Sequence, residues 1–373
     1  MQKREELTGI QFLRGFCALG VVIGHCAGML AMPKYGELRT LGGVLEDGAL
    51  GVDIFFTISG FIMAVVALEG SALKPRMSIA AFAQRRFVRI IPMMWIAILS
   101  YAVLQKLFAR DAIDVAAYLR ALFLLPFSYV KPDIIWTLRQ ELIFYLVFAL
   151  SFFGRPRMRW LLAAWLVSPV VFLLSRGSLW ASTGYIDNFW SILCSTVNLE
   201  FGMGLALGVL WTRASPTPRS DWALPVHPFV TLAVLVAAIL GSTRMLGLVS
   251  QTLPSVLFLG VTGTMLVGLA ARARCPAGWL TALGGLLGDA SYSIYLFHLH
   301  ILAGLLVVRA KLQVLNDGPA AVTAIVVAST AICIGIHLLV ERPLTRWLRA
   351  RFAGGRPRPA QPGMMEKPAT PPV

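Results

Sequence analysis

The chain has 373 residues, of which 57% are hydrophobic and only 14% are charged, and its formal net charge is +15 at pH 7. A soluble domain carries roughly 25% charged residues, so this composition argues against a soluble fold and indicates a protein surrounded by lipid. The basic residues lie between the apolar segments rather than along one helix face, which argues against nucleic-acid binding and is typical of cytoplasmic membrane loops.

Ten apolar segments reach the length of about 20 residues that a bilayer crossing requires. They cover residues 9–30, 48–69, 87–107, 134–153, 159–176, 189–211, 227–243, 252–271, 283–307 and 319–340. We therefore expect an all-α polytopic membrane protein whose transmembrane domain occupies residues 1–353. If the N-terminus is cytoplasmic, the cytoplasmic loops hold roughly twice as many arginines and lysines as the outer loops, and the C-terminus is cytoplasmic too.

Three segments can be assigned a structural type from their composition. Residues 1–30 contain Arg14 and His25 within the apolar run, so we interpret them as a retained first span rather than a signal peptide. Residues 109–125 are expected to form an amphipathic helix on the outer bilayer surface. The proline-rich residues 354–373 predict a disordered cytoplasmic tail.

Two ionisable residues, Arg14 and His25, lie inside the first apolar segment, where charge is costly and usually functional. They are eleven residues apart, so a helix places them on one face, about 16 Å apart along its axis. Arg14 is then near the cytoplasmic end and His25 deep toward the outside. The alternative is a snorkelling arginine and a structural histidine.

Asp53 lies in the second segment, about five residues from its outer end, and His25 is equally far from the outer end of the first segment. Antiparallel neighbouring helices would place the two at equal depth. We therefore predict that Asp53 hydrogen-bonds His25 and fixes its tautomer. The alternative is that Asp53 faces interfacial water.

Arg86 and Arg89 open the third segment and share a helix face, because they are three residues apart. Paired guanidinium groups bind phosphate well, although positive-inside anchoring explains such a cluster equally.

In the fourth segment Glu141 is costly unless paired, and Arg139 on the same helix faces elsewhere. We therefore expect Glu141 to meet another helix or a wet cavity.

The ninth segment carries Tyr292, Tyr295 and His298 on one face, at helical spacing. Two tyrosines and a histidine in line suit a sugar or a pantetheine arm, although tyrosines near a membrane edge are also ordinary interface residues. His300 lies on another face. The five cysteines contain no C-x-x-C pair, and neither disulfides nor a metal site is expected.

Several stretches together resemble the acyltransferase-3 family of integral membrane acyltransferases, and most of all the exopolysaccharide O-acetyltransferases. The matching stretches, in the family's order, are Ile10 to Arg14 with His25, Gly51 to Met63, Arg85 to Pro92, Trp136 to Glu141 with Phe144 and Tyr145, Ser291 to His298, and Glu341 to Pro343. One departure is Leu142, where relatives often have a second glutamate after the position of Glu141.

This resemblance implies ten spans and acetyl transfer from cytoplasmic acetyl-CoA to a hydroxyl of an extracytoplasmic or lipid-linked polysaccharide, without a metal. It implies that Arg14, Arg86 and Arg89 bind the donor and that His25, with Asp53 and Glu141, carries the chemistry. Around the acceptor we expect Trp136, Tyr145, Tyr292, Tyr295 and His298. A bacterial inner-membrane location follows, with membrane lipids, the glycan acceptor and polysaccharide-assembly proteins as expected partners.

Two other functions fit the same composition. A proton-coupled transporter or flippase would use the buried arginine, histidine and carboxylates, but no inverted repeat is visible. A lipid-glycan polymerase usually needs a large outer loop, and the longest candidate here, residues 108–133, is modest.

Overall fold

The computed structural model describes residues 7–38, 50–108, 113–179, 188–213, 226–315 and 317–353. The longer helices are α1 (Thr8–Leu30), α2 (Leu50–Ala67), α3 (Ile79–Phe108), α5 (Trp136–Phe153), α6 (Arg159–Ser175), α8 (Asn198–Arg213), α9 (Pro228–Met245), α10 (Leu253–Arg272), α11 (Trp279–Leu312), α12 (Gly318–Ile336) and α13 (Arg342–Ala353). Short helices α4 (Val115–Leu122) and α7 (Phe189–Leu193) lie between them, and β1 (Leu68–Glu69) pairs with β2 (Lys74–Pro75).

Within these described ranges, nine helical segments are long and apolar enough to cross a membrane, and the apolar helix Gly51–Ala67 is shorter. Each of the ten predicted segments therefore coincides with an apolar helix, which confirms the all-α polytopic fold. Of the predicted amphipathic helix at 109–125, α4 is present, and residues 109–112 lie outside the described ranges. The predicted tail at 354–373 also lies outside them.

Some boundaries differ from the prediction. The segment predicted at 189–211 is two helices, and the side chains of Thr196 and Asn198 at the break bond backbone carbonyl groups. The Oγ1 of Thr196 donates to the carbonyl O of Gln251, and the Nδ2 of Asn198 donates to that of Leu193, each at 2.9 Å. After α12, residues His337–Glu341 form one π-helical turn that leads into α13.

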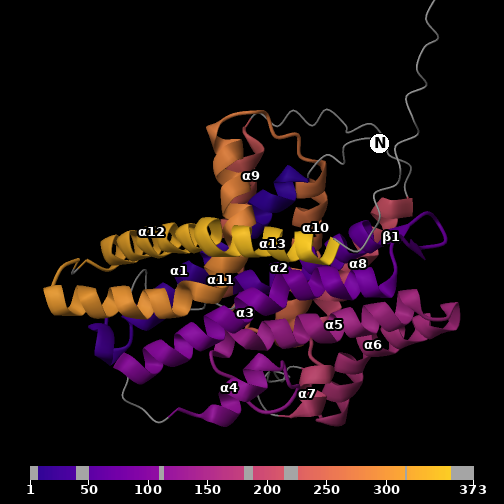
Figure 1. The fold of residues 1–373 in the computed structure, drawn as a ribbon, viewed down its shortest axis with the longest axis horizontal. Helices are drawn as coiled ribbons and strands as arrows, with labels where there is room; N and C mark the ends of the chain where they lie inside the picture. The colour runs from indigo at the N-terminus through magenta and orange to yellow at the C-terminus, as the bar shows by residue number, and fades with distance from the viewer. Residues whose placement is uncertain are drawn as a thin grey trace, which may run out of the picture.

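Helix α1 lies at the centre of the bundle and packs against α2, α9, α10, α11 and α12. Figure 1 shows α3, α5, α11 and α12 running in roughly one direction, with α9 steeply inclined to them and α13 continuing the line of α12. The core therefore surrounds the helix that carries Arg14 and His25.

Glycines bring α2 and α8 into backbone contact, as small residues commonly do between membrane helices. A Cβ on Gly60 would overlap the carbonyl O of Phe201, and a Cβ on Gly204 would overlap that of Thr57. The two helices run parallel here, which places the first turns of α2 and α8 side by side.

We expect Gly204→Ala to lower the stability of the folded protein by about 1–3 kcal/mol, because the added methyl group must push α8 away from α2. Thermal unfolding of the detergent-solubilised protein measures this change. Gly241→Ala in α9 is the matched control, since nothing lies within 4 Å of its Cβ position. Equal melting temperatures for the two variants would show that the α2–α8 contact is not close-packed.

Candidate functional site

A cavity of about 90 Å³ lies between α1, α2, α3, α5 and α11. Its lining includes these residues of the predicted site: Arg14, Arg86, Arg89, Glu141, Tyr145, Tyr292 and Tyr295. Ser59, Thr137 and Ser291 add hydroxyl groups, and the remaining lining is apolar. A cavity of this volume has room for several water molecules, and therefore for a slender polar chain. It gathers residues that are far apart in the sequence.

Arg14 is held against α11 by neutral oxygens. Its Nη1 donates to the Oε1 of Gln11 at 2.9 Å, and its Nη2 donates to the Oγ of Ser291 at 2.8 Å. Close contact between α1 and α11 permits this, since a Cβ on Gly288 would overlap the backbone of Gln11. Neither hydrogen bond is to a carboxylate, although the charges of Asp289, Glu341 and Glu141 also act on the guanidinium.

Arg86 and Arg89 approach the same cavity from α3. The guanidinium of Arg86 lies 5.7 Å from the ring centre of Phe82 and 5.4 Å from that of Tyr145. Its Nε is buried without a hydrogen-bond partner in the described structure. Within the described part of the chain, neither arginine makes an ion pair of 4.0 Å or less with a carboxylate, and the charge of Arg89 acts on Arg14. The three arginines therefore form a cationic cluster suited to phosphate.

Glu141 faces the cavity from α5. The hydroxyl of Tyr145, one turn along, donates to its Oε1, and the Oγ of Ser59 on α2 donates to the same atom at 3.4 Å. Glu141 therefore meets hydroxyl groups of α2 and α5 at a polar cavity. Its charge also interacts with that of Arg14.

The tyrosines of α11 continue the site along one face of that helix. The hydroxyl of Tyr292 donates to the carbonyl O of Ile90 at 2.8 Å, and that of Tyr295 donates to the carbonyl O of Ile134 at 3.0 Å. The Tyr295 hydroxyl is also 2.7 Å from the Oγ1 of Thr137. These contacts tie α11 to α3 and α5 and fix the position of both rings.

One turn beyond Tyr295, His298 meets His25. The Nε2 of His298 is 3.1 Å from the Nδ1 of His25, and the ring centres are 5.0 Å apart. The Nδ1 of His298 is 2.6 Å from the carbonyl O of Tyr295 and 3.2 Å from that of Ile294. Carbonyl oxygens only accept, so this Nδ1 carries a proton, and in the neutral ring Nε2 is an acceptor.

The Nδ1 of His25 must therefore be the donor to His298, which leaves the Nε2 of His25 with its lone pair. That is the form a general base needs. Neither histidine lines the cavity itself, and the ring of Tyr295, 6.0 Å from that of His298, lies between the cavity and the pair. From the sequence we expect His298 near the acceptor, but its contact with His25 is not predicted.

Asp53 is buried in the first turn of α2, and its carboxyl interacts with that of Glu200 in the first turn of α8. A Cβ on Gly51 would lie 2.7 Å from the carbonyl O of Cys17, so the start of α2 meets the middle of α1 rather than its His25 end. The role of Asp53 as the partner that orients His25 stays a prediction. The sequence missed Glu200, although an acidic residue in an apolar span is itself a signal.

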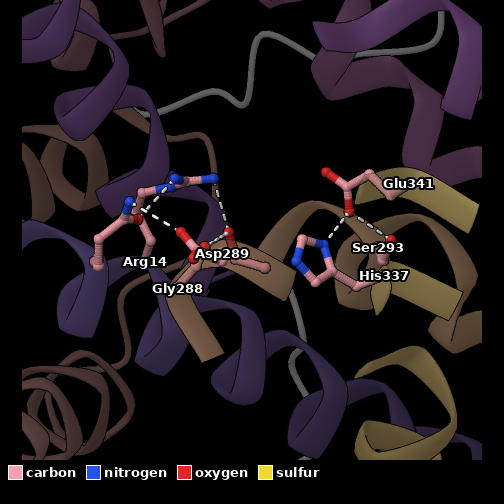
Figure 2. Close-up of polar contacts among 8 residues, drawn as sticks. Arg14, Gly288, Asp289, Ser293, His337 and Glu341 are labelled. Carbon is pink, nitrogen blue, oxygen red and sulfur yellow. Dashed lines mark hydrogen bonds and ion pairs between the residues drawn. The ribbon is translucent and has the colours of Figure 1, made fainter. Parts of the chain in front are cut away.

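Trp136 and Glu341 do not line the cavity. Trp136 packs its ring 5.9 Å from that of Phe56, behind the cavity wall rather than in it. Glu341 accepts from the Oγ of Ser293 at 2.6 Å, and its Oε2 is 2.7 Å from the Nδ1 of His337. Figure 2 shows this group further along α11 than the contacts of Arg14. The family resemblance includes the stretch Glu341 to Pro343 but implies no role for Glu341.

Taken together, the fold and the cavity define a polytopic helical membrane protein with a cationic, hydroxyl-lined site in the bundle interior. Among the described residues, no three His, Cys, Asp or Glu side chains gather as a metal site. Residues 7–338 match the model of the Acyl_transf_3 family, described as an acyltransferase domain. The chain belongs to this family and is a membrane acyltransferase.

Two curated proteins are similar to the chain over most of their length. The exopolysaccharide production protein ExoZ of Rhizobium meliloti (strain 1021) is 31% identical over 315 residues, covering 82% of this chain and 92% of the relative. The acyltransferase MdmB of Streptomyces mycarofaciens is 27% identical over 393 aligned residues, covering 95% of each. No solved structure matches the chain significantly.

Proposed function

We propose that the protein transfers an acetyl group from cytoplasmic acetyl-CoA to a hydroxyl of an extracytoplasmic or lipid-linked polysaccharide. The observation that carries this proposal is a cavity lined by Arg14, Arg86 and Arg89, one wall of which, Tyr295, packs against His298 of the histidine pair. A cationic entrance suits a phosphorylated donor, and a histidine whose Nε2 is unprotonated suits a hydroxyl acceptor. The likeness to ExoZ, named for exopolysaccharide production, favours a glycan acceptor.

In this proposal the three arginines bind phosphate oxygens of the donor at the end of the cavity that the sequence predicts to be cytoplasmic. The pantetheine arm occupies the cavity, whose volume of about 90 Å³ fits a narrow chain. Tyr292, Tyr295 and Glu141 offer hydrogen-bonding groups along that path. The thioester is thereby delivered toward His25 on the far side of Tyr295.

The Nε2 of His25 removes the proton from the acceptor hydroxyl as its oxygen attacks the thioester carbonyl carbon. The C–O bond forms and the C–S bond breaks, and the protonated His25 returns the proton to the sulfur of the leaving CoA. His298 accepts a hydrogen bond from the Nδ1 of His25 throughout, so it acts as a positioning residue. Asp53 is kept in this proposal as the predicted orienting partner of His25, and its carboxyl also interacts with that of Glu200.

The experiment that tests this function incubates membranes containing the protein with acetyl-CoA labelled in the acetyl group and with candidate glycans. We expect a labelled, base-labile O-acetyl ester that is absent from membranes without the protein. Label that crosses the membrane unchanged, without an ester, would favour a transporter instead. The proposed setting is the bacterial inner membrane, with polysaccharide-assembly proteins as partners.

A further inference from the structure

The cavity cannot hold the whole donor that the proposed function requires. Coenzyme A ends in a nucleotide with a diphosphate and a separate ribose phosphate, and a space of about 90 Å³ has room only for part of the slender arm. The nucleotide must therefore lie outside the cavity, and its several negative charges need cations there. A second group of arginines is present close by, on α13.

Helix α13 lies next to the site at both of its ends. It begins directly after Glu341, which is bonded to Ser293 of α11 and whose charge interacts with that of Arg14. Near its other end, Phe352 lines an apolar groove of about 560 Å³ along α3 and α5. That groove shares Arg86 and Tyr145 with the wall of the cavity, so α13 spans the neighbourhood of the cationic entrance.

The arginines of α13 are arranged as a stripe. At about 100° per residue, Arg342, Arg346 and Arg349 fall within roughly 60° of one another around the helix axis. Arg351 points about 180° away from the stripe, and Phe352 faces the groove. All four arginines are exposed, and within the described residues none of them pairs with a carboxylate within 4.0 Å.

We propose that Arg342, Arg346 and Arg349 form the subsite for the nucleotide phosphates of the acyl-CoA donor, an inference that rests on the proposed function. Three guanidinium groups along two helical turns match a ligand with several phosphates at different positions. Arg14, Arg86 and Arg89 then bind the phosphate oxygens that lie next to the pantetheine arm. The occupant is the nucleotide, and binding of anionic lipid headgroups by the same stripe is the competing outcome.

The test compares two donors in proteoliposomes made of phosphatidylcholine alone, so that anionic lipid is absent. Acetyl-CoA carries the nucleotide, and acetyl-pantetheine has the same thioester without any phosphate. For the double variant R346A/R349A we expect the KM for acetyl-CoA to rise by about 10-fold or more, since charge-assisted hydrogen bonds are lost. The KM for acetyl-pantetheine should not change. R351A removes the same charge from the other side of α13 and should leave both KM values unchanged.

A second measurement does not depend on turnover. Adenosine 3′,5′-bisphosphate, the nucleotide end of the donor, should bind the purified full-length protein, and R346A/R349A should weaken that binding while R351A does not. Equal KM changes for the two donors, or unchanged nucleotide binding in R346A/R349A, would overturn the subsite. If the wild type transfers acetyl from neither donor, the proposed function fails, and the binding measurement still decides whether α13 holds the nucleotide.

Discussion

His25→Ala is expected to lower the acyl-transfer rate by about 10²–10⁴-fold, the range over which a positioned general base acts. Without the imidazole, no group at this position takes the proton from the acceptor hydroxyl. The KM for acetyl-CoA should stay near that of the wild type, because the arginines proposed to bind the donor line the cavity, which His25 does not. Initial rates with labelled acetyl-CoA, corrected for the amount of folded protein, measure both values.

The matched control is His300→Ala, which removes a partly buried histidine from α11, the helix that carries His298. His300 packs its ring 6.0 Å from that of Tyr101 and 5.3 Å from that of Phe297, away from the His25 contact. We expect this variant to keep nearly full activity. Full activity in His25→Ala, with normal expression, would remove His25 from the chemistry and leave it as a structural residue.

His298→Leu is expected to reduce the rate by about 10²-fold or more with little change in the KM for acetyl-CoA. The leucine cannot accept the proton of the His25 Nδ1, so His25 populates the tautomer whose lone pair faces the wrong way. An orienting residue that sets the tautomer of a catalytic histidine has effects of this size in other enzymes. His298→Gln should recover part of the activity, because its amide oxygen is an acceptor of similar reach.

A spectroscopic measurement separates this role from simple packing. With ¹⁵N-labelled histidine, the wild type should show His25 protonated at Nδ1, whereas His298→Leu should show a mixture of tautomers. His300→Leu serves as the control with an unchanged His25 signal. Equal losses in the leucine and glutamine variants, with the His25 signal unchanged, would mean that His298 only fills space.

Much of the fold follows from local composition. An apolar run of about 20 residues has few alternatives to a membrane helix, because lipid offers no partner for an exposed peptide group. For this reason the ten predicted segments coincide with helices. The split between α7 and α8 and the π turn before α13 did not follow, since they depend on hydrogen bonds such as that from Thr196 to Gln251, which lies on a distant segment.

For the candidate site, the sequence predicts several residues but not their partners in space. Arg14 and Glu141 could be predicted from the sequence, because an ionisable side chain in an apolar span is costly unless it is used. Arg86 and Arg89 could be predicted from their spacing, which places both on one helix face. Their partners could not be found, because a neighbour in space leaves no local signal. Glu200 illustrates the limit: the sequence paired Asp53 with His25 by depth alone, and the structure brings the Asp53 carboxyl to α8.

Composition and helical periodicity depend only on neighbouring residues, so they suffice to predict a helical membrane protein with polar residues inside its spans. Which of those residues come into contact depends on how the helices pack. Glycines set how closely the helices approach, and this approach places His298 against His25 although 273 residues separate them in the chain. The same packing decides which nitrogen of His25 keeps its lone pair, because that depends on the hydrogen-bond acceptor that another helix supplies.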